Sequence, residues 1–237
     1  MFLKIFIAFI FLLILYIIIA NLSPRLKPNL VVVTSVINIS NKPLSYTNVR
    51  SFCDSNRRFE DTKKTIESIK KYIPNSKIIF IECSKLERYK EEYLKKNVDY
   101  YENYADDTEI MDKVNSSSKT LGEGTLTLKA FEYILKENIE YQNLFKISGR
   151  YWLNDDFDYE IYNNNQNIIK IKTEEQIHTC LYKLNRETVY KFNVFLNKFL
   201  QKCHDSMHYE VFFKKFILQN KPDFAFLDIN LGISGYI

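Results

Sequence analysis

The sequence predicts an α/β fold with a mostly parallel sheet flanked by helices, preceded by one N-terminal transmembrane helix. Three observations support this prediction. Residues 5–20 form an apolar run without a charged side chain. The β-branched segment 30–37 (LVVVTSVI) does not alternate in polarity, as expected for a strand buried on both faces of a sheet. Further short apolar segments alternate with helical patterns over the first 150 residues, which indicates a parallel sheet.

The N-terminal segment 1–22 is predicted to be a transmembrane signal-anchor. About 20 helical residues rise roughly 30 Å, the thickness of the hydrocarbon core of a bilayer. The run lacks the polar face that a core helix of a globular protein would show. A signal peptide cleaved after Ala20 is the alternative interpretation. Residues 23–28 then form a short stem, and residues 29–237 form the folded domain.

The side of the membrane on which the body lies is not fixed by the flanking charges, which nearly balance. We expect a lumenal or exterior body, where the sequons at Asn38 and Asn115 would be glycosylated. The cysteines do not have the spacing of a metal site. They could form disulfides or be buried as free thiols. They are widely separated along the chain: Cys53, Cys83, Cys180 and Cys203.

The elements of the body follow from hydrophobic spacing. Residues 61–73 carry Thr62, Ile66 and Ile69 at helical spacing, and Pro74 ends this helix. The glycines at 122 and 124 precede a helical pattern that runs to residue 138. The remaining expected strands are short and apolar, and the remaining expected helices are amphipathic. The strands are 76–84, 98–105, 143–148, 167–172, 179–184 and 223–229, and the helices are 86–97, 186–202 and 208–220.

Composition and motifs exclude several classes of protein. The chain has 33 basic and 29 acidic residues, and this balance argues against binding of nucleic acid. It contains no GxGxxG, GxxxxGK[ST] or GxSxG motif, which argues against dehydrogenases, P-loop enzymes and α/β-hydrolases. The three histidines lack the spacing of a zinc site.

A ligand site is predicted where the strand at 143–148 ends. Ligands of parallel α/β sheets bind beyond the carboxyl ends of the strands. Ser148 and Gly149 lie at this end. They are followed by Arg150, whose guanidinium can donate several hydrogen bonds to a phosphate group. Trp152 offers a flat face for a base or a sugar, and Lys146 supplies a second cation within the strand.

Several segments together resemble a group of glycosyltransferase-like proteins of viruses and bacteria. This group is similar in outline to the GT-A nucleotide-diphospho-sugar transferases, which have a Rossmann-type sheet. The resemblance covers nearly all of residues 29–237 and implies a nucleotide sugar as donor and a hydroxyl group as acceptor. It is carried by LSYTNVRSFCDSNRRFEDTKKTIESIKKYIPNSKIIFIECS, KTLGEG, NLFKISGRYWLNDDF, TCLYKL, HYEVFF and LGISGYI.

The chain departs from the GT-A pattern at one point. That family usually carries Asp-x-Asp after the strand that corresponds to LFKIS, where it holds a divalent metal. Two solutions remain open. Lys146 or Arg150, with Arg57 or Arg58, neutralises the diphosphate directly, which we favour. Alternatively, carboxylates a few residues further on bind Mn²⁺ or Mg²⁺. These carboxylates are Asp155, Asp156 and Asp158, and Asp106 and Asp107 form a weaker candidate pair.

The resemblance also implies a catalytic base if the transfer inverts configuration. Glu210, at the start of a helix, matches an acidic residue of the resembling group, and Glu123 lies near another helix start. Both could equally be ordinary carboxylates of a first helical turn. The expected function is a membrane-anchored glycosyltransferase that acts on a glycan, lipid or protein hydroxyl. The alternative is an inactive membrane-tethered binding protein that retains the fold.

Overall fold

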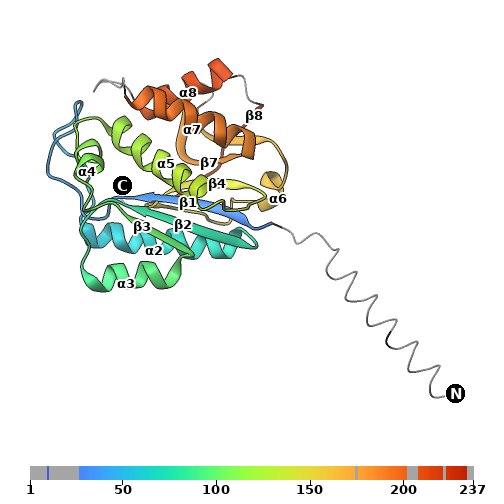
Figure 1. Cartoon of the computed structure of the whole chain (residues 1–237), viewed down its shortest axis with the longest axis horizontal. Coiled ribbons are helices and arrows are strands. Elements are labelled where there is room, and N and C mark those ends of the chain that lie inside the picture. The colour runs from blue at the N-terminus through green and yellow to red at the C-terminus, as the bar shows by residue number, and fades with distance from the viewer. Residues whose placement is uncertain (1–9, 11–26, 174–175, 202–207, 221–222, 234–237) are drawn as a thin grey trace.

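The computed structural model describes residues 10, 27–173, 176–201, 208–220 and 223–233 (Figure 1). The predicted signal-anchor lies outside these residues, apart from Ile10, as does most of the predicted stem. Over the part of the chain described, no helix combines the length and the apolar character that a membrane crossing requires. The boundaries predicted for the anchor, the stem and the domain therefore stay predictions.

A seven-stranded sheet forms the centre of the body, in the order β3-β2-β1-β4-β7-β6-β8. The first four of these strands are parallel, whereas β7 is antiparallel to both β4 and β6. This topology confirms the predicted mostly parallel sheet and the more mixed second half. The strands are β1 (Asn29–Ser35), β2 (Ser76–Glu82), β3 (Tyr100–Asn103), β4 (Leu144–Ser148), β6 (Asn167–Thr173), β7 (Gln176–Leu184) and β8 (Phe224–Leu227).

Helices cover both faces of the sheet (Figure 1). One face carries α4, α5, α7 and α8, and the other carries α2 and α3. A two-stranded ribbon of β5 (Tyr151–Trp152) and β9 (Gly232–Ile233) lies outside the main sheet. The helices are α2 (Ser55–Tyr72), α3 (Arg88–Asn97), α4 (Thr108–Val114), α5 (Lys119–Lys136), α6 (Tyr159–Tyr162), α7 (Arg186–Leu200) and α8 (Tyr209–Asn220).

Strand β1 divides the core into two layers. All of its residues are buried, and successive side chains point to opposite faces of the sheet. Leu30 and Val32 belong to the core under α5, whereas Val31 and Val33 belong to the core over α2. The strand ends at Ser35 instead of continuing to Ile37, as the sequence had indicated. Burial on both faces thus explains why this segment lacks alternating polarity.

Two helix starts differ from the sequence-based expectation. Helix α2 begins at Ser55, several residues before the predicted start at residue 61, because the Asp54 side chain accepts a hydrogen bond from the backbone N–H of Arg57. Helix α5 begins at Lys119, with Ser118 as its cap, so Gly122 and Gly124 lie inside the helix. A Cβ at Gly124 would overlap the side chain of Leu200 in α7, so this glycine serves helix packing.

The described cysteines, at positions 53, 83 and 180, are buried, and none of them forms a disulfide with another described residue. Their wide separation in the sequence is matched by separate places in the fold. Cys83 belongs to the core under α5, and Cys180 belongs to the core over α2. Cys203 lies outside the described residues, so a disulfide and a free thiol both stay open for it.

Candidate functional site

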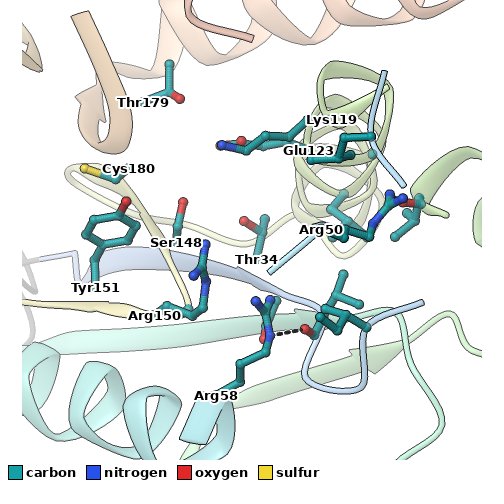
Figure 2. A pocket seen from close by; sticks show the side chains of 18 of the residues that line it. Thr34, Arg50, Arg58, Lys119, Glu123, Ser148, Arg150, Tyr151, Thr179 and Cys180 are labelled. Carbon is teal, nitrogen blue, oxygen red and sulfur yellow. Dashed lines mark hydrogen bonds between the residues drawn. The ribbon is translucent and has the colours of Figure 1, made fainter. Parts of the chain in front are cut away.

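A pocket opens at the carboxyl ends of β1 and β4 (Figure 2). Thr34 and Ser35 contribute from β1, and Ser148 contributes from the end of β4. Because β7 runs antiparallel to β4, its first half lies at the same edge of the sheet. The start of α5 and the loop before α2 complete the wall. The pocket therefore lies where ligands bind in open α/β sheets, as the sequence predicted.

Arg150 lines this pocket from the turn after β4. Two threonines of α2 hold the turn, because Thr62 Oγ1 donates to the Gly149 carbonyl and Thr65 Oγ1 to the Tyr151 carbonyl, each at 2.8 Å. A Cβ at Gly149 would lie 3.0 Å from the Cβ of Ser35, so the close approach of β1 requires a glycine here. Within the described residues, no hydrogen bond or ion pair occupies the Arg150 guanidinium.

Arg58 is the second guanidinium of the pocket, and unlike Arg150 it is buried. Its Nε donates to the Val36 carbonyl at 2.8 Å, and its Nη1 donates to Ser51 Oγ at 3.3 Å. Burial, and next the positive charge of Arg150, lower the pKa of Arg58 to about 9. Two like charges held close together in a pocket are stabilised when an anion binds between them.

Two further cations of the pocket were not predicted from the sequence: Arg50 and Lys119. Arg50 Nη2 donates to the Val114 carbonyl at 2.6 Å, which ties the loop before α2 to the end of α4. Burial lowers the pKa of Arg50. For Lys119, burial is outweighed by Glu123 and Glu210, which raise its pKa. Both lie in segments that carry the resemblance, because Arg50 belongs to the segment that starts with LSYTNVRS and Lys119 is the first residue of KTLGEG.

Glu123 and Lys146 form an ion pair at the base of the pocket. Lys146 Nζ lies 2.7 Å from Glu123 Oε1, and their side chains are 0% and 15% exposed. The same ammonium group donates to Ser148 Oγ at 2.9 Å and to the Thr179 carbonyl at 3.2 Å. Burial raises the pKa of Glu123, but Lys146 and then Lys119 outweigh it, so the pKa is lowered. Lys146 thus neutralises a carboxylate that lines the pocket and does not itself line it.

Glu210 also lines the pocket and is far less constrained than Glu123. It lies in the first turn of α8, and its Oε1 accepts a hydrogen bond of 3.2 Å from Thr179 Oγ1. The structure therefore brings both predicted base candidates into one pocket, with Lys119 influenced by the two of them. A general base must accept a proton, and the ion pair makes Glu123 the weaker base.

Breaking the Glu123–Lys146 pair is expected to destabilise the fold. Glu123→Gln leaves the Lys146 ammonium buried without its counter-charge, which costs about 3–5 kcal/mol of unfolding free energy. Urea denaturation followed by circular dichroism measures this loss. As a control, Glu109→Gln at the exposed Glu109–Lys113 pair should cost no more than about 1 kcal/mol. Equal losses in the two variants would show that the buried pair has no special role.

Cys180 and His178 meet on the pocket wall, with Cys180 Sγ 3.2 Å from His178 Nδ1. Burial raises the pKa of Cys180 to about 12 and lowers the pKa of His178. The sulfur is therefore a protonated thiol at neutral pH, and this pair does not provide the thiolate that nucleophilic catalysis requires.

Besides Lys146, two residues predicted for nucleotide binding do not line the pocket: Trp152 and Arg57. Trp152 pairs with Gly232 in the β5–β9 ribbon, and a Cβ at Gly232 would overlap the indole ring. Lys64 Nζ lies 4.6 Å from the centre of this ring. Arg57 is exposed in the first turn of α2, one position away from the buried Arg58. Only Arg58 of that pair, together with Ser148, Gly149 and Arg150, is brought to the pocket.

The predicted metal-binding carboxylates lie outside the pocket. Asp155, Asp156 and Asp158 are exposed. Asp155 accepts hydrogen bonds from Tyr72 and Lys71, and the Asp158 side chain caps α6. Over the described ranges, no cluster of three or more His, Cys, Asp or Glu side chains is arranged to hold a metal ion. Binding of Mn²⁺ or Mg²⁺ by these carboxylates stays a prediction.

The two predicted glycosylation sites are both partly buried. The amide nitrogen of Asn38, to which a glycan would be attached, donates a hydrogen bond to the Lys85 carbonyl. Asn115 follows α4 and lines the pocket, and its carbonyl accepts a hydrogen bond from Arg50. A glycan at Asn38 would have to break the contact with Lys85.

Comparisons with known proteins relate this fold to proteins that handle nucleotide sugars. No protein-family model and no curated protein sequence matches the chain. Core-mannan synthase A of Aspergillus fumigatus, in its Mn/GDP form, has a TM-score of 0.55 and 9% identity over 91% of this chain and 76% of that chain. A nucleoside-diphosphate-sugar pyrophosphorylase of Vibrio cholerae has a TM-score of 0.51 and 9% identity over 82% and 90%.

These similarities confirm the fold resemblance predicted from the sequence. The chain shares its α/β fold with these two proteins, and this fold agrees with the GT-A-like sheet that the resemblance implied. At 9% identity they define the fold class alone. Activity and substrates must be argued from the pocket itself.

Proposed function

We propose that the chain is a membrane-anchored glycosyltransferase that moves a sugar from a nucleotide sugar to a hydroxyl group of a glycan, lipid or protein. The observation that carries this proposal is the cationic pocket at the strand ends, where the unengaged Arg150 lies beside the buried Arg58. A diphosphate is an anion that two guanidinium groups can bind through several hydrogen bonds. The anchor at residues 1–22 and the lumenal or exterior body belong to the proposal.

The proposed reaction is a single displacement at the anomeric carbon. Glu210 accepts the proton of the acceptor hydroxyl as the oxygen forms a bond with that carbon. The bond from the carbon to the phosphate oxygen breaks, and its electron pair leaves with the nucleoside diphosphate. Arg58 and Arg150 stabilise the negative charge that develops on this leaving group. Cations thereby perform the task for which other GT-A proteins use a metal ion.

Nucleotide binding by the full chain in detergent micelles tests the proposal. We expect one of UDP, GDP or CMP to stabilise the protein in a thermal shift assay. At a hundredfold excess over Kd, ligand linkage gives about 2.7 kcal/mol, or roughly 5–10 °C in Tm. The shift should persist in EDTA and change little when Mn²⁺ is added.

Three other outcomes would each change the interpretation. A shift that requires Mn²⁺ would support the metal-binding alternative. Binding without any transfer to an acceptor would support the inactive tethered protein. Absence of stabilisation by all three nucleotides would refute the transferase function.

A further inference from the structure

We infer that Tyr46 and His208 form a stacking platform for a sugar ring of the acceptor at the rim of the pocket. This inference rests on the proposed transferase function and names the class of acceptor, a carbohydrate. The two rings come from segments far apart in the sequence. Their centres are 5.1 Å apart and their planes are tilted by 45°.

Tyr46 is displayed on a turn that is fixed to the pocket wall. Leu44 and Thr47 form a backbone bridge around the turn, and the Ser45 N–H donates to the Ser117 carbonyl at 3.0 Å. Leu44 and Arg50, on either side of Tyr46 in the chain, both line the pocket. The Tyr46 residue is nevertheless 53% exposed. A ring held in place but left open to solvent is preorganised for contact with a ligand.

The second ring places this platform next to the proposed base. The His208 carbonyl accepts a hydrogen bond from the Phe212 N–H, so His208 is fixed at the start of α8. Glu210 lies two residues further along the same helix start and lines the pocket. An acceptor ring that contacts Tyr46 and His208 would therefore have its hydroxyl groups close to the carboxylate that takes the proton.

The chemistry of the two side chains favours a sugar ring. Tyrosine and histidine each combine a flat apolar ring with a polar group at its edge. A pyranose has the complementary character, with C–H groups on its faces and hydroxyl groups around its edge. Val49 and Phe52 continue the exposed apolar surface along the same loop, 44% and 87% exposed. That surface would accommodate further units of an oligosaccharide.

Saturation-transfer NMR tests this platform on the full chain loaded with the nucleotide (UDP, GDP or CMP) that stabilises it in the thermal shift assay. The probes are methyl glycosides of glucose, galactose, mannose, xylose and N-acetylglucosamine. At least one should receive saturation at its ring protons, and Tyr46→Ala should weaken its binding roughly three- to tenfold, as expected for one stacking contact. Tyr46→Phe should retain binding. Tyr190→Ala is the matched control, because Tyr190 is 61% exposed on α7 and does not line this pocket.

The outcomes separate this inference from the proposed function. Equal effects of Tyr46→Ala and Tyr190→Ala, or no signal from any glycoside while the nucleotide still binds, would overturn the platform and leave the donor site intact. The second of these results would favour a peptide or lipid acceptor. Failure of UDP, GDP and CMP to bind the wild-type chain would refute the transferase itself, and the acceptor platform with it.

Discussion

Arg150→Ala is expected to weaken nucleotide binding roughly 10- to 100-fold while leaving the fold intact. Hydrogen bonds to charged groups contribute about 1.5–3 kcal/mol, and within the described residues the Arg150 guanidinium has no protein partner to lose. Its removal should therefore change the unfolding free energy by less than about 0.5 kcal/mol. Isothermal titration with the nucleotide identified by thermal shift measures the first effect, and urea denaturation measures the second.

Arg57→Ala supplies a matched control, because the same charge is removed from an exposed position outside the pocket. Its affinity for nucleotide should equal that of the wild type. An unfolded Arg150→Ala variant would show that Arg150 is structural, and an affinity equal to that of Arg57→Ala would show that the diphosphate binds elsewhere. Either result would remove the main support for a transferase.

The pH dependence of nucleotide binding reports on the neighbouring guanidinium. Burial and Arg150 hold the pKa of Arg58 at about 9, so Arg58 is charged at neutral pH and loses its charge as the pH rises through about 9. A bound diphosphate favours the charged form. The affinity should therefore fall as the pH rises through this range. In Arg58→Lys the fall should begin at a lower pH, because lysine has a lower ordinary pKa than arginine, and an unchanged profile would show that another group is responsible.

The sequence predicted the strands and the site where local patterns determine structure. β1 shows its burial on both faces in its composition, and Ser148, Gly149 and Arg150 follow a strand whose end opens into the pocket. Glu123 and Glu210 were recognised as acids at helix starts, and both line that pocket. In each case, the pattern of residues within one short segment was enough for the prediction.

Two residues predicted to contact the ligand, Trp152 and Lys146, do not line the pocket, because their positions depend on distant partners. Trp152 lies only two positions after Arg150, but pairing with Gly232, 80 residues later in the chain, holds it in a separate ribbon. Lys146 carries a positive charge that could bind a diphosphate, but its ammonium group is already paired with Glu123 on α5. Hydrophobic periodicity in a single sequence reports local structure, so it does not reveal pairings between residues this far apart in the chain.

The phase of α2 explains why Arg57 and Arg58 could not be distinguished beforehand. The sequence-based interpretation began the helix near residue 61, whereas the Asp54 cap starts it at Ser55. With that start, Arg58 shares the buried face with Thr62 and Thr65, and Arg57 points to solvent. An error of several residues in the helix start leaves the orientation of both arginines undetermined.

Glu210→Gln is expected to lower kcat by roughly 10²- to 10⁴-fold without weakening nucleotide binding, because general-base catalysis contributes about that much. The glutamine keeps the shape of the side chain, and its carbonyl oxygen can still accept the hydrogen bond from Thr179 Oγ1. The measurement is transfer from the nucleotide sugar to the glycoside that binds at the Tyr46 platform, with kcat separated from KM.

The contrast with Glu123→Gln makes this prediction discriminating. Glu123 holds the buried Lys146 at 2.7 Å, so its replacement should lower the unfolding free energy, whereas Glu210→Gln should leave that energy nearly unchanged. A base acts on the rate and an ion-pair partner acts on the fold, so two assays on two variants separate the roles. If Glu210→Gln retained full kcat while a stably folded Glu123→Gln had lost it, the assignments would be reversed. Lys146 would then serve to keep the base ionised.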